Sequence, residues 1–317
     1  MKKKVLVFGD IGIDDTVALL YGYFKEEIEI VAVVADYGNI SRENAIANIN
    51  YVRKLLPHTS ELERVKFIAG ASVPMTGELP TFVTEIHGEF GLGPIIPPLG
   101  MNNGTTENFH HVVEIIEKYQ KELIIVNIGR LTSLATMFIL YQSLMKTVKA
   151  YYIMGGAFWV PGNITAVSEA NFHGDPVAAA IVLNYARNVT IIPLNVTQHA
   201  IATPQMIKYI DQTGKISILK PMLDYYYNFY KKRDPSIQGS PLHDVLTLMA
   251  VAHDDLLSYQ ELPVTIVVSY KGVERGQSIA DIRPYTESEA KKHRIAFVLN
   301  YQRFYSDFMT VMSGRYF

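Results

Sequence analysis

The stretch VLVFGDIGIDD, residues 5–15, decides the fold of this chain. Its first four residues, Val5–Phe8, form a short apolar run that is typical of a buried strand. From Asp14 to Phe24, apolar residues recur at the spacing of a helix. A buried strand that leads at once into such a helix predicts the first unit of an α/β fold.

The same alternation of strand and helix patterns continues downstream. Further strands are predicted at residues 28–34, 65–68, 123–126, 150–153 and 189–194. Further helices are predicted at residues 45–56, 131–139 and 176–186. The alternation predicts a mostly parallel, Rossmann-like central sheet flanked by helices. No internal repeat or low-complexity linker interrupts the pattern, so residues 1–317 are expected to form one domain.

Composition excludes several classes of function. The chain has 317 residues, 49% of them hydrophobic, which is enough for a large core. Its 29 basic and 31 acidic residues give a net charge of −2, without the basic excess of a dedicated nucleic-acid binder. The absence of cysteine excludes disulfides, thiolate catalysis and cysteine-ligated metals. Any metal must therefore be bound by oxygen or imidazole.

The N-terminus resembles a secretory signal only at first sight. Three lysines precede Val5–Phe8, but this apolar run is shorter than the roughly seven residues that a signal peptide needs. No apolar run reaches the roughly 18 residues of a membrane-spanning helix. We therefore expect a cytoplasmic protein that does not enter membranes.

Three carboxylates, Asp10, Asp14 and Asp15, follow the first predicted strand within six residues. Helix capping explains Asp14 as an N-cap and Asp15 as a first-turn acid, but it gives no role to Asp10. Crowded carboxylates repel one another unless a cation neutralises them, and their hard oxygen ligands suit Ca²⁺ or Mg²⁺. The spacing alone leaves capping and metal binding equally open.

A second cluster is Ser240-Pro241-Leu242-His243-Asp244. Ser240 as N-cap and Pro241 as first helical residue predict a helix start there. His243 and Asp244 then lie in its first turn. A lone histidine is more often a structural, half-buried residue, but an adjacent aspartate favours metal binding or proton transfer.

Polar residues also gather in long loops that follow predicted strands. The loops span residues 70–108 and 155–174, and an open α/β sheet binds its ligands at such strand ends. Asn163, Glu169 and Asn171 are hydrogen-bonding residues that suit a sugar, although each is equally a common turn residue. Asp175-Pro176 predicts an N-cap followed by the first residue of a helix.

Eight short segments occur in an order that carries a resemblance. They are Phe8–Asp15, Gly38-Asn39, His87–Leu92, Ile128–Ser133, Met154–Gly156, Gly162-Asn163, Glu169–Asn171 and His243-Asp244. Each is weak alone, but together they resemble the inosine–uridine-type nucleoside hydrolase family over nearly the whole chain. The resemblance implies an enzyme that cleaves the N-glycosidic bond of ribonucleosides, with its active site at the carboxyl ends of the strands. It also implies a homodimer or homotetramer.

The resemblance also assigns roles to individual residues. It implies one Ca²⁺ held by the side chains of Asp10, Asp15 and Asp244 and by the backbone carbonyl of Ile128. It places ribose hydroxyls on Asp14, Asn39, Asn171, Asn163 and Glu169, with Met154 lining the pocket. Asp10 would be the general base toward water, and His243 the acid that protonates the leaving base. Several aromatic residues are candidates to contact the base, although packing explains most of the tyrosines: His87, Phe158, Trp159, Tyr226, Tyr227 and Tyr230.

The chain departs from the family pattern at four positions. Phe8 and Phe90 stand where the family has aspartate, Arg130 replaces a proline or glycine, and Ala170 replaces a frequent phenylalanine. The implied side-chain ligands are all present, so we expect an active enzyme with altered specificity.

Two alternatives stand beside this interpretation. A haloacid-dehalogenase-type phosphatase would use Asp10 as nucleophile, but it needs a second aspartate where this chain has Gly12. A catalytically silent nucleoside- or ribose-binding protein is suggested by Phe8, Phe90 and Ala170. We favour catalysis over both.

Overall fold

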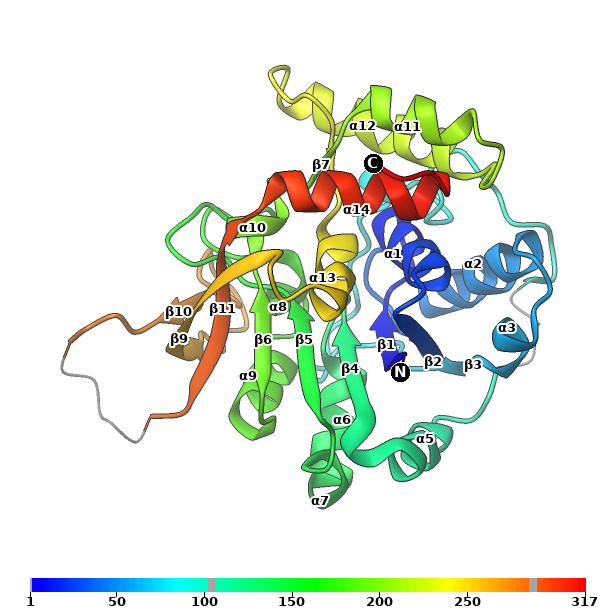
Figure 1. The fold of residues 1–317 in the computed structure, drawn as a ribbon. Coiled ribbons are helices and arrows are strands. Elements are labelled where there is room, and N and C mark those ends of the chain that lie inside the picture. The colour runs from blue at the N-terminus through cyan, green and yellow to red at the C-terminus, as the bar shows by residue number, and fades with distance from the viewer. Residues whose placement is uncertain (1, 102–105, 285–289) are drawn as a thin grey trace.

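The computed structural model describes residues 2–101, 106–284 and 290–317. A nine-stranded sheet forms its centre, in the order β10-β9-β11-β6-β5-β4-β1-β2-β3 (Figure 1). The strands from β11 to β3 run parallel, and β9 and β10 are antiparallel additions at one edge. Their bounds are β1 Lys3–Gly9, β2 Ile28–Ala35, β3 Lys66–Ala69, β4 Leu123–Asn127, β5 Ala150–Met154, β6 Val189–Ile192, β9 Leu257–Ile266, β10 Ser278–Ala280 and β11 Lys292–Leu299.

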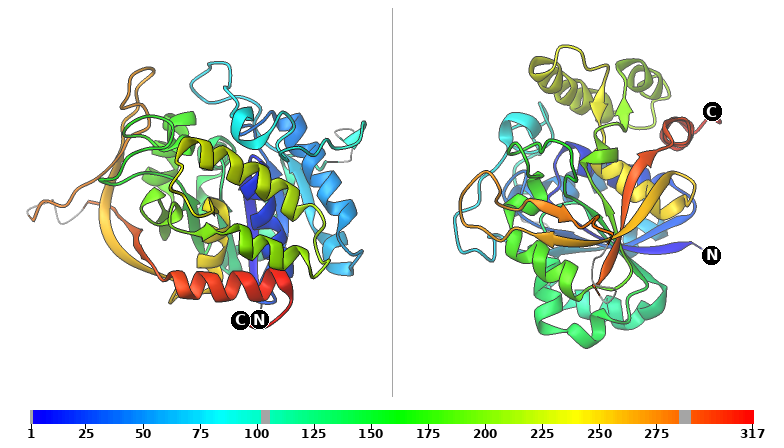
Figure 2. Two further views of the ribbon diagram at one scale, coloured as in Figure 1. Left: turned by 90° about the horizontal axis from the view of Figure 1, so that it is seen from above. Right: turned by 90° about the vertical axis from the view of Figure 1, so that its left-hand side faces the viewer.

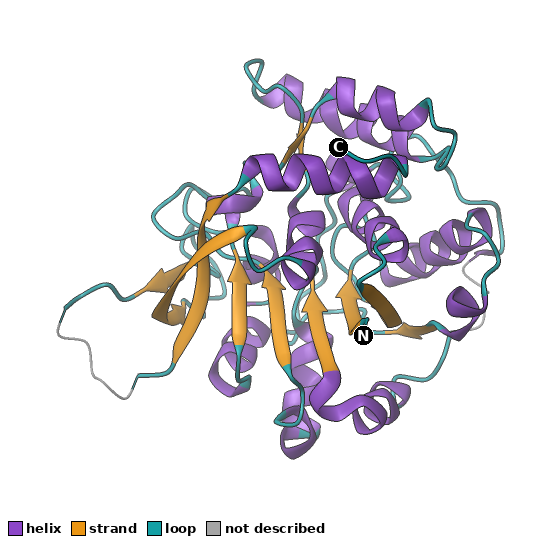
Figure 3. Ribbon diagram, in the orientation of Figure 1, coloured by secondary structure: helices purple, strands orange, loops and turns teal. Residues whose placement is uncertain are grey.

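Helices cover both faces of the sheet (Figures 1 and 3). Along β1, Val5 and Val7 join one hydrophobic cluster, while Leu6 and Phe8 join the other. Successive side chains of a strand point to opposite faces, so this central strand must be apolar throughout. The first cluster includes α1 Ile13–Phe24, α2 Arg42–Leu55, α13 His243–Ala252 and α14 Tyr301–Ser313. The second includes α5 His111–Tyr119, α6 Thr132–Leu140, α7 Gln142–Met145 and α9 Pro176–Tyr185.

A smaller layer stands beyond the carboxyl ends of the parallel strands (Figures 1 and 2). It contains α11 Pro204–Asp211, α12 Leu219–Arg233 and a two-stranded sheet of β7 Ile201–Ala202 and β8 Ser240–Pro241. Short elements complete the connections: α3 Ser60–Arg64, α4 Thr84–His87, η2 Gln120–Glu122, α8 Ala170–Gly174 and α10 Leu194–Thr197. Long loops and α12 therefore surround the edge of the sheet where polar residues were expected.

The single α/β architecture and its mostly parallel sheet are confirmed, and so is the Asp175-Pro176 helix start. The strand predicted to reach residue 194 ends at Ile192, because Pro193 offers no N–H to a ladder and α10 begins next. The predicted loop at residues 70–108 contains α4, and its residues 102–105 lie outside the described part of the chain.

Two predicted helix starts are wrong. Ser240 and Pro241 pair as β8 with Ile201–Ala202 instead of capping a helix, and α13 begins at His243. At the first helix, Gly12 takes the N-cap position that was expected for Asp14.

Among the residues that the structure describes, no helix combines the length and apolar character needed to cross a bilayer.

Candidate active site

Four aspartates meet at the carboxyl edge of the sheet. Asp10 directly follows β1, Asp14 and Asp15 lie in the first turn of α1, and Asp244 lies in the first turn of α13. The two helices begin at this edge and pack against each other through apolar side chains, which brings their first turns together. All four side chains are buried, none being more than 5% exposed.

Three of these carboxylates are close enough to share one metal ion. Asp14, Asp15 and Asp244 each offer an oxygen within 4.8 Å of the others. Asp10, the other aspartate expected here, lies beside this group and not within it. Asn39 binds both of its oxygens. The Asn39 backbone N–H donates to Asp10 Oδ2 at 2.7 Å, and Asn39 Nδ2 donates to Asp10 Oδ1 at 3.0 Å.

Asn39 also connects Asp10 to Asp15. Its Nδ2 donates to Asp15 Oδ2 at 3.0 Å, and the same carboxylate accepts the backbone N–H groups of Asp10 at 3.1 Å and Gly12 at 3.0 Å. Asn39 follows Gly38, where an added Cβ would stand 1.7 Å from Asp10 Oδ2. The Gly-Asn pair therefore provides both the space for Asp10 and the bonds that orient it.

The loop between β1 and α1 holds an uncommon backbone conformation. Ile11 has a φ of +38°, which is rare for a β-branched residue and is maintained only by its surroundings. Its carbonyl accepts a hydrogen bond from Asn48 Nδ2 at 3.0 Å, and Asn48 also donates to the carbonyl of Phe90 at 2.8 Å. The Phe90 loop is thus fixed at this point through its backbone carbonyl.

Burial dominates the electrostatics of the cluster. It raises the pKa of Asp14 and Asp15 to about 7 each, with a further rise from the neighbouring carboxylates, and it raises the pKa of Asp10 and Asp244 well above the usual range. The charge of Arg130 acts to lower the pKa of Asp10, but among the described residues no lysine or arginine forms an ion pair with any of the four. Four buried oxygen donors without a paired cation are a donor set that fits a hard divalent metal ion.

Ile128 and Asn171 close another side of the site. Ile128 follows β4 directly, and its backbone N–H donates to the carbonyl of Phe8 at 2.8 Å. Asn171, in α8, donates from Nδ2 to the carbonyls of Ile128 at 3.1 Å and Met154 at 3.3 Å. The expected carbonyl ligand and two residues expected at the sugar therefore lie together, and Asn171 Oδ1 has no hydrogen-bond partner among the described residues.

The side chains of Glu169 and Asn163 accept hydrogen bonds from nearby backbone N–H groups. The Glu169 carboxylate caps α8 by accepting the backbone N–H groups of Asn171 at 2.7 Å and Phe172 at 3.1 Å, and it also accepts that of Gly156 at 3.0 Å. Asn163 Oδ1 accepts the N–H of Ala170 at 2.9 Å. Both residues stand at the start of the helix that carries Asn171, and these bonds hold that helix in place.

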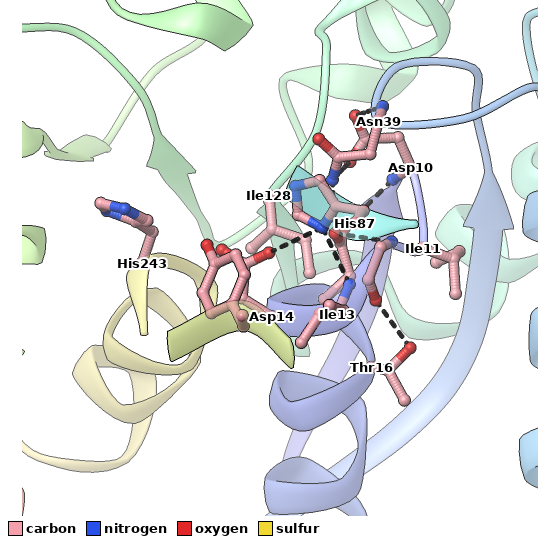
Figure 4. A network of polar contacts seen from close by, with 12 residues as sticks. Asp10, Ile11, Ile13, Asp14, Thr16, Asn39, His87, Ile128 and His243 are labelled. Atoms are coloured by element: carbon pink, nitrogen blue, oxygen red, sulfur yellow. Dashed lines mark hydrogen bonds and ion pairs between the residues drawn. The ribbon is translucent and has the colours of Figure 1, made fainter. Parts of the chain in front are cut away.

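His243 lies at the first turn of α13, next to Asp244 (Figure 4). Its Nδ1 is 2.8 Å from Thr197 Oγ1, and its Nε2 is 3.4 Å from the hydroxyl of Tyr230. Burial lowers the pKa of His243 to about 4, so the imidazole is neutral near pH 7 in the free protein. The sequence did not indicate Thr197, because its contact with His243 arises only in the fold.

His87, at the end of α4, reaches the same site (Figure 4). Its Nδ1 accepts the backbone N–H of Ile13 at 3.0 Å and lies 3.9 Å from Asp14 Oδ1. Its ring packs beside Tyr226, and Tyr226 packs edge-on against Tyr230. Burial, followed by the charge of His243, lowers the pKa of His87 to about 3. Tyr226 and Tyr230 of α12, two of the aromatic residues that were candidates to contact the base, therefore lie next to the site.

The chain is similar to known proteins over nearly its whole length. The family model for inosine-uridine preferring nucleoside hydrolases matches residues 5–306. The chain is 30% identical to uridine nucleosidase 1 of Arabidopsis thaliana over 88% of this chain and 82% of that protein. It is 28% identical to the inosine-uridine preferring nucleoside hydrolase of Crithidia fasciculata over 96% of each chain. The purine-preferring ribonucleoside hydrolase of Gardnerella vaginalis superposes with a TM-score of 0.89, at 28% identity and 98% coverage of each chain.

A strand–helix carboxylate cluster of this kind, on a fold and a sequence matched nearly end to end, identifies an enzyme that hydrolyses N-ribosyl bonds. The chain belongs to the inosine-uridine preferring nucleoside hydrolase family.

Proposed function

We propose that this enzyme hydrolyses ribonucleosides to ribose and free base at the four-aspartate cluster, with Ca²⁺ as its metal. The observation that carries the proposal is the buried group of Asp14, Asp15 and Asp244, with Asp10 beside it. Such a group has no structural benefit by itself, because four buried carboxylates repel one another. A single nucleoside hydrolase domain over residues 1–317 is part of the proposal.

The residues proposed to hold Ca²⁺ are Asp10, Asp15 and Asp244, together with the carbonyl of Ile128. When bound, Ca²⁺ neutralises the cluster and makes a nearby water molecule more acidic. Asp10 is then the general base that accepts the proton of the attacking water. Asn39 supports this role by holding both Asp10 oxygens in a fixed direction.

Sugar hydroxyls are proposed to bind to five polar residues around the cluster, with Met154 lining the pocket: Asp14, Asn39, Asn163, Glu169 and Asn171. Fixing the ribose ring in a reactive geometry removes part of the entropic barrier. Cleavage of the N-glycosidic bond builds positive charge on the sugar, as in glycoside hydrolysis, and the carboxylates stabilise that charge.

His243 is proposed as the acid toward the leaving base. Its neutral state in the free protein reflects burial. The negative charge that develops on the departing base favours the imidazolium form and opposes that effect. Thr197 at Nδ1 orients the ring so that Nε2 faces away from α10, toward Tyr230.

The preferred base is a separate question, since the relatives are named for uridine, for inosine and uridine, and for purines. The test is a panel of purine and pyrimidine ribonucleosides, incubated with the protein and Ca²⁺ and assayed for free ribose and base. We expect turnover with at least one nucleoside, its loss on chelation of the metal, and a loss of about 10²–10⁴-fold in Asp10→Asn. Tight nucleoside binding without product would instead support a silent binding protein, and near-normal turnover by Asp10→Asn would contradict its role as base.

The homodimer or homotetramer that the family resemblance implies is likewise part of the proposal. Light scattering coupled to size-exclusion chromatography measures it directly, and a mass of a single chain would contradict it.

A further inference from the structure

A second pocket, of about 310 Å³, lies apart from the aspartate cluster. It is enclosed by the loop of residues 74–81, the end of α8 at His173 and Gly174, Arg130, and the hairpin loop of residues 270–275. The segments around residues 80 and 270 lie on the same side of the molecule (Figure 2). None of the four aspartates lines this pocket.

Arg130 brings a buried positive charge to the pocket wall. Its side chain is only 8% exposed, its Nη2 donates to the carbonyl of Thr81 at 3.2 Å, and its guanidinium stacks 5.2 Å from the ring of Tyr37. It forms no ion pair with a carboxylate in the part of the chain that the structure describes. The charge of Arg130 acts to lower the pKa of Asp10 and of Glu169, so it is partly balanced from a distance, but only its Nη2 has a hydrogen-bond partner among the described residues. Its remaining N–H groups can therefore donate to an anion in the pocket that it lines.

The remaining charges around the pocket are also mainly positive. Lys271 and Arg275 line it, and the single lining carboxylate, Glu78, is paired with Arg275. Arg275 is otherwise held by the backbone, donating from Nε to the carbonyl of His173 and from Nη1 to that of Tyr270, each at 2.8 Å. The lining of the pocket therefore carries more positive than negative charge. Arg130 and Lys271 contribute the excess, and Arg275 is paired with Glu78.

The pKa of His173, which also lines the pocket, is affected by these positive charges. Burial lowers its pKa, and the charges of Arg275 and Arg130 lower it further, while Glu78 acts in the opposite direction. The approach of Arg130 is tight, because a Cβ added at Gly174 would stand 2.2 Å from Arg130 Nε. The glycine thus lets the guanidinium lie against α8, at the wall of the pocket.

We propose that this pocket is a binding site for a small phosphate-bearing anion, either inorganic phosphate or the phosphate group of a phosphomonoester. Arginine presents several N–H donors in a planar fork that matches the oxygens of phosphate. A volume of about 310 Å³ accommodates a phosphate with a small substituent such as a pentose, and it excludes a nucleic-acid strand. The site shares no residue with the aspartate cluster, although the charge of Arg130 also acts on Asp10.

The test is calorimetric titration of the protein with inorganic phosphate, ribose 5-phosphate and, as uncharged control, ribose, in buffer without calcium. Arg130→Gln removes the buried charge, and Lys271→Glu changes an exposed residue of the hairpin whose replacement spares the core. Arg187→Gln is the matched control, because Arg187 is exposed and does not line the pocket. Thermal melting checks that each variant is folded.

We expect saturable phosphate binding that weakens about 10- to 100-fold in Arg130→Gln, a loss typical of a charged hydrogen bond, and severalfold in Lys271→Glu, with no change in Arg187→Gln. Tighter binding of ribose 5-phosphate than of phosphate would identify a phosphomonoester as the ligand, and equal binding would identify free phosphate. Absence of saturable binding, or equal losses in all three variants, would overturn the proposal.

A second readout does not depend on variants. Phosphate placed beside Arg130 and Arg275 offsets their charges, so it raises the pKa of His173 in an NMR titration of the histidine rings. The exposed His58 serves as the internal reference and should not respond. An unchanged His173, or an equal change at His58, would contradict binding in this pocket.

Discussion

At the scale of single residues, the aspartates of the site differ in their polar contacts, and these contacts are the basis for giving them different roles. Asp10 is fixed through both oxygens by Asn39, whereas Asp14 faces His87 and groups with Asp15 and Asp244. Asp14 is proposed to bind a ribose hydroxyl and Asp15 to bind the metal ion, although both belong to the same group of three carboxylates. The two roles can be separated by experiment.

Replacing Asp14 and Asp15 one at a time by asparagine separates these roles. Asp15→Asn should weaken calcium binding at least about ten times more than Asp14→Asn, because only Asp15 is proposed as a direct ligand. Asp14→Asn should mainly raise the KM for nucleosides. Calorimetric titration with Ca²⁺ and steady-state kinetics measure the two effects. Equal losses of calcium affinity would show that Asp14 is itself a ligand.

The acid role of His243 is tested with substrates that differ in their leaving group. His243→Ala should reduce the turnover of natural nucleosides by about 10²–10⁴-fold, because their bases leave more easily when protonated. It should affect p-nitrophenyl riboside far less, since p-nitrophenolate leaves without a proton. Kinetics on both substrates provide the comparison, and equal losses would remove His243 as the acid.

At the scale of elements, the site relies on helices α1 and α13 starting at fixed positions over the sheet. A buried network at their other ends holds them to α14. Asp307 of α14 accepts from the hydroxyl of Tyr21 at 2.5 Å and from Lys25 Nζ at 2.6 Å, and it lies 2.9 Å from His253 Nε2. Burial alone would raise the pKa of Asp307, but the hydrogen bonds from His253, Lys25 and Tyr21 outweigh it and lower the pKa to about 2.

This network predicts a pH-dependent loss of stability. Asp307→Asn should lower the free energy of unfolding by about 3–5 kcal/mol at pH 7, because it removes the buried carboxylate that pairs with the Lys25 ammonium. A folded-state pKa of about 2 lies below the unfolded value of about 3.9, so the contribution is fully present above about pH 4 to 5 and is lost as the pH falls toward 2. The difference in urea midpoint between the two proteins, measured from pH 7 to pH 3, should therefore shrink below pH 4.

Asp281→Asn is the matched control for this measurement. Asp281 also has a pKa lowered to about 2, by hydrogen bonds from Arg283, but that pair lies at the surface. Its loss should change stability little, as for other exposed ion pairs. A loss of stability as large as that of Asp307→Asn, or an Asp307 effect that does not change with pH, would contradict the role of burial.

At the scale of the whole molecule, much of the architecture could be predicted from the sequence because its signals are local. The apolar run of β1 and the helical spacing of α1 predicted a strand–helix unit, and parallel strands bring their carboxyl ends to one edge. The position of Asp10, Asp14 and Asp15 at this edge follows from that topology, whereas Asp244 comes after β8, which is not part of the large sheet.

Features that depend on distant contacts could not be predicted. Ser240-Pro241 looks like a helix start, but it pairs with Ile201–Ala202, some forty residues away. His87 accepts a hydrogen bond from the start of α1, and only the folded chain brings α4 there. The lowered pKa values of His87 and His243 arise from burial in the folded molecule. The sequence around each histidine does not predict that burial.

The reaction proposed for this fold delivers water to the C1′ carbon of a ribonucleoside. Its most direct test is a turnover of the calcium-loaded protein in H₂¹⁸O, with the products analysed by mass spectrometry soon after mixing. We predict one ¹⁸O in the hydroxyl at C1′ of the released ribose and none in the free base. Release of a base that carries ¹⁸O, or no release of ribose, would contradict the claim.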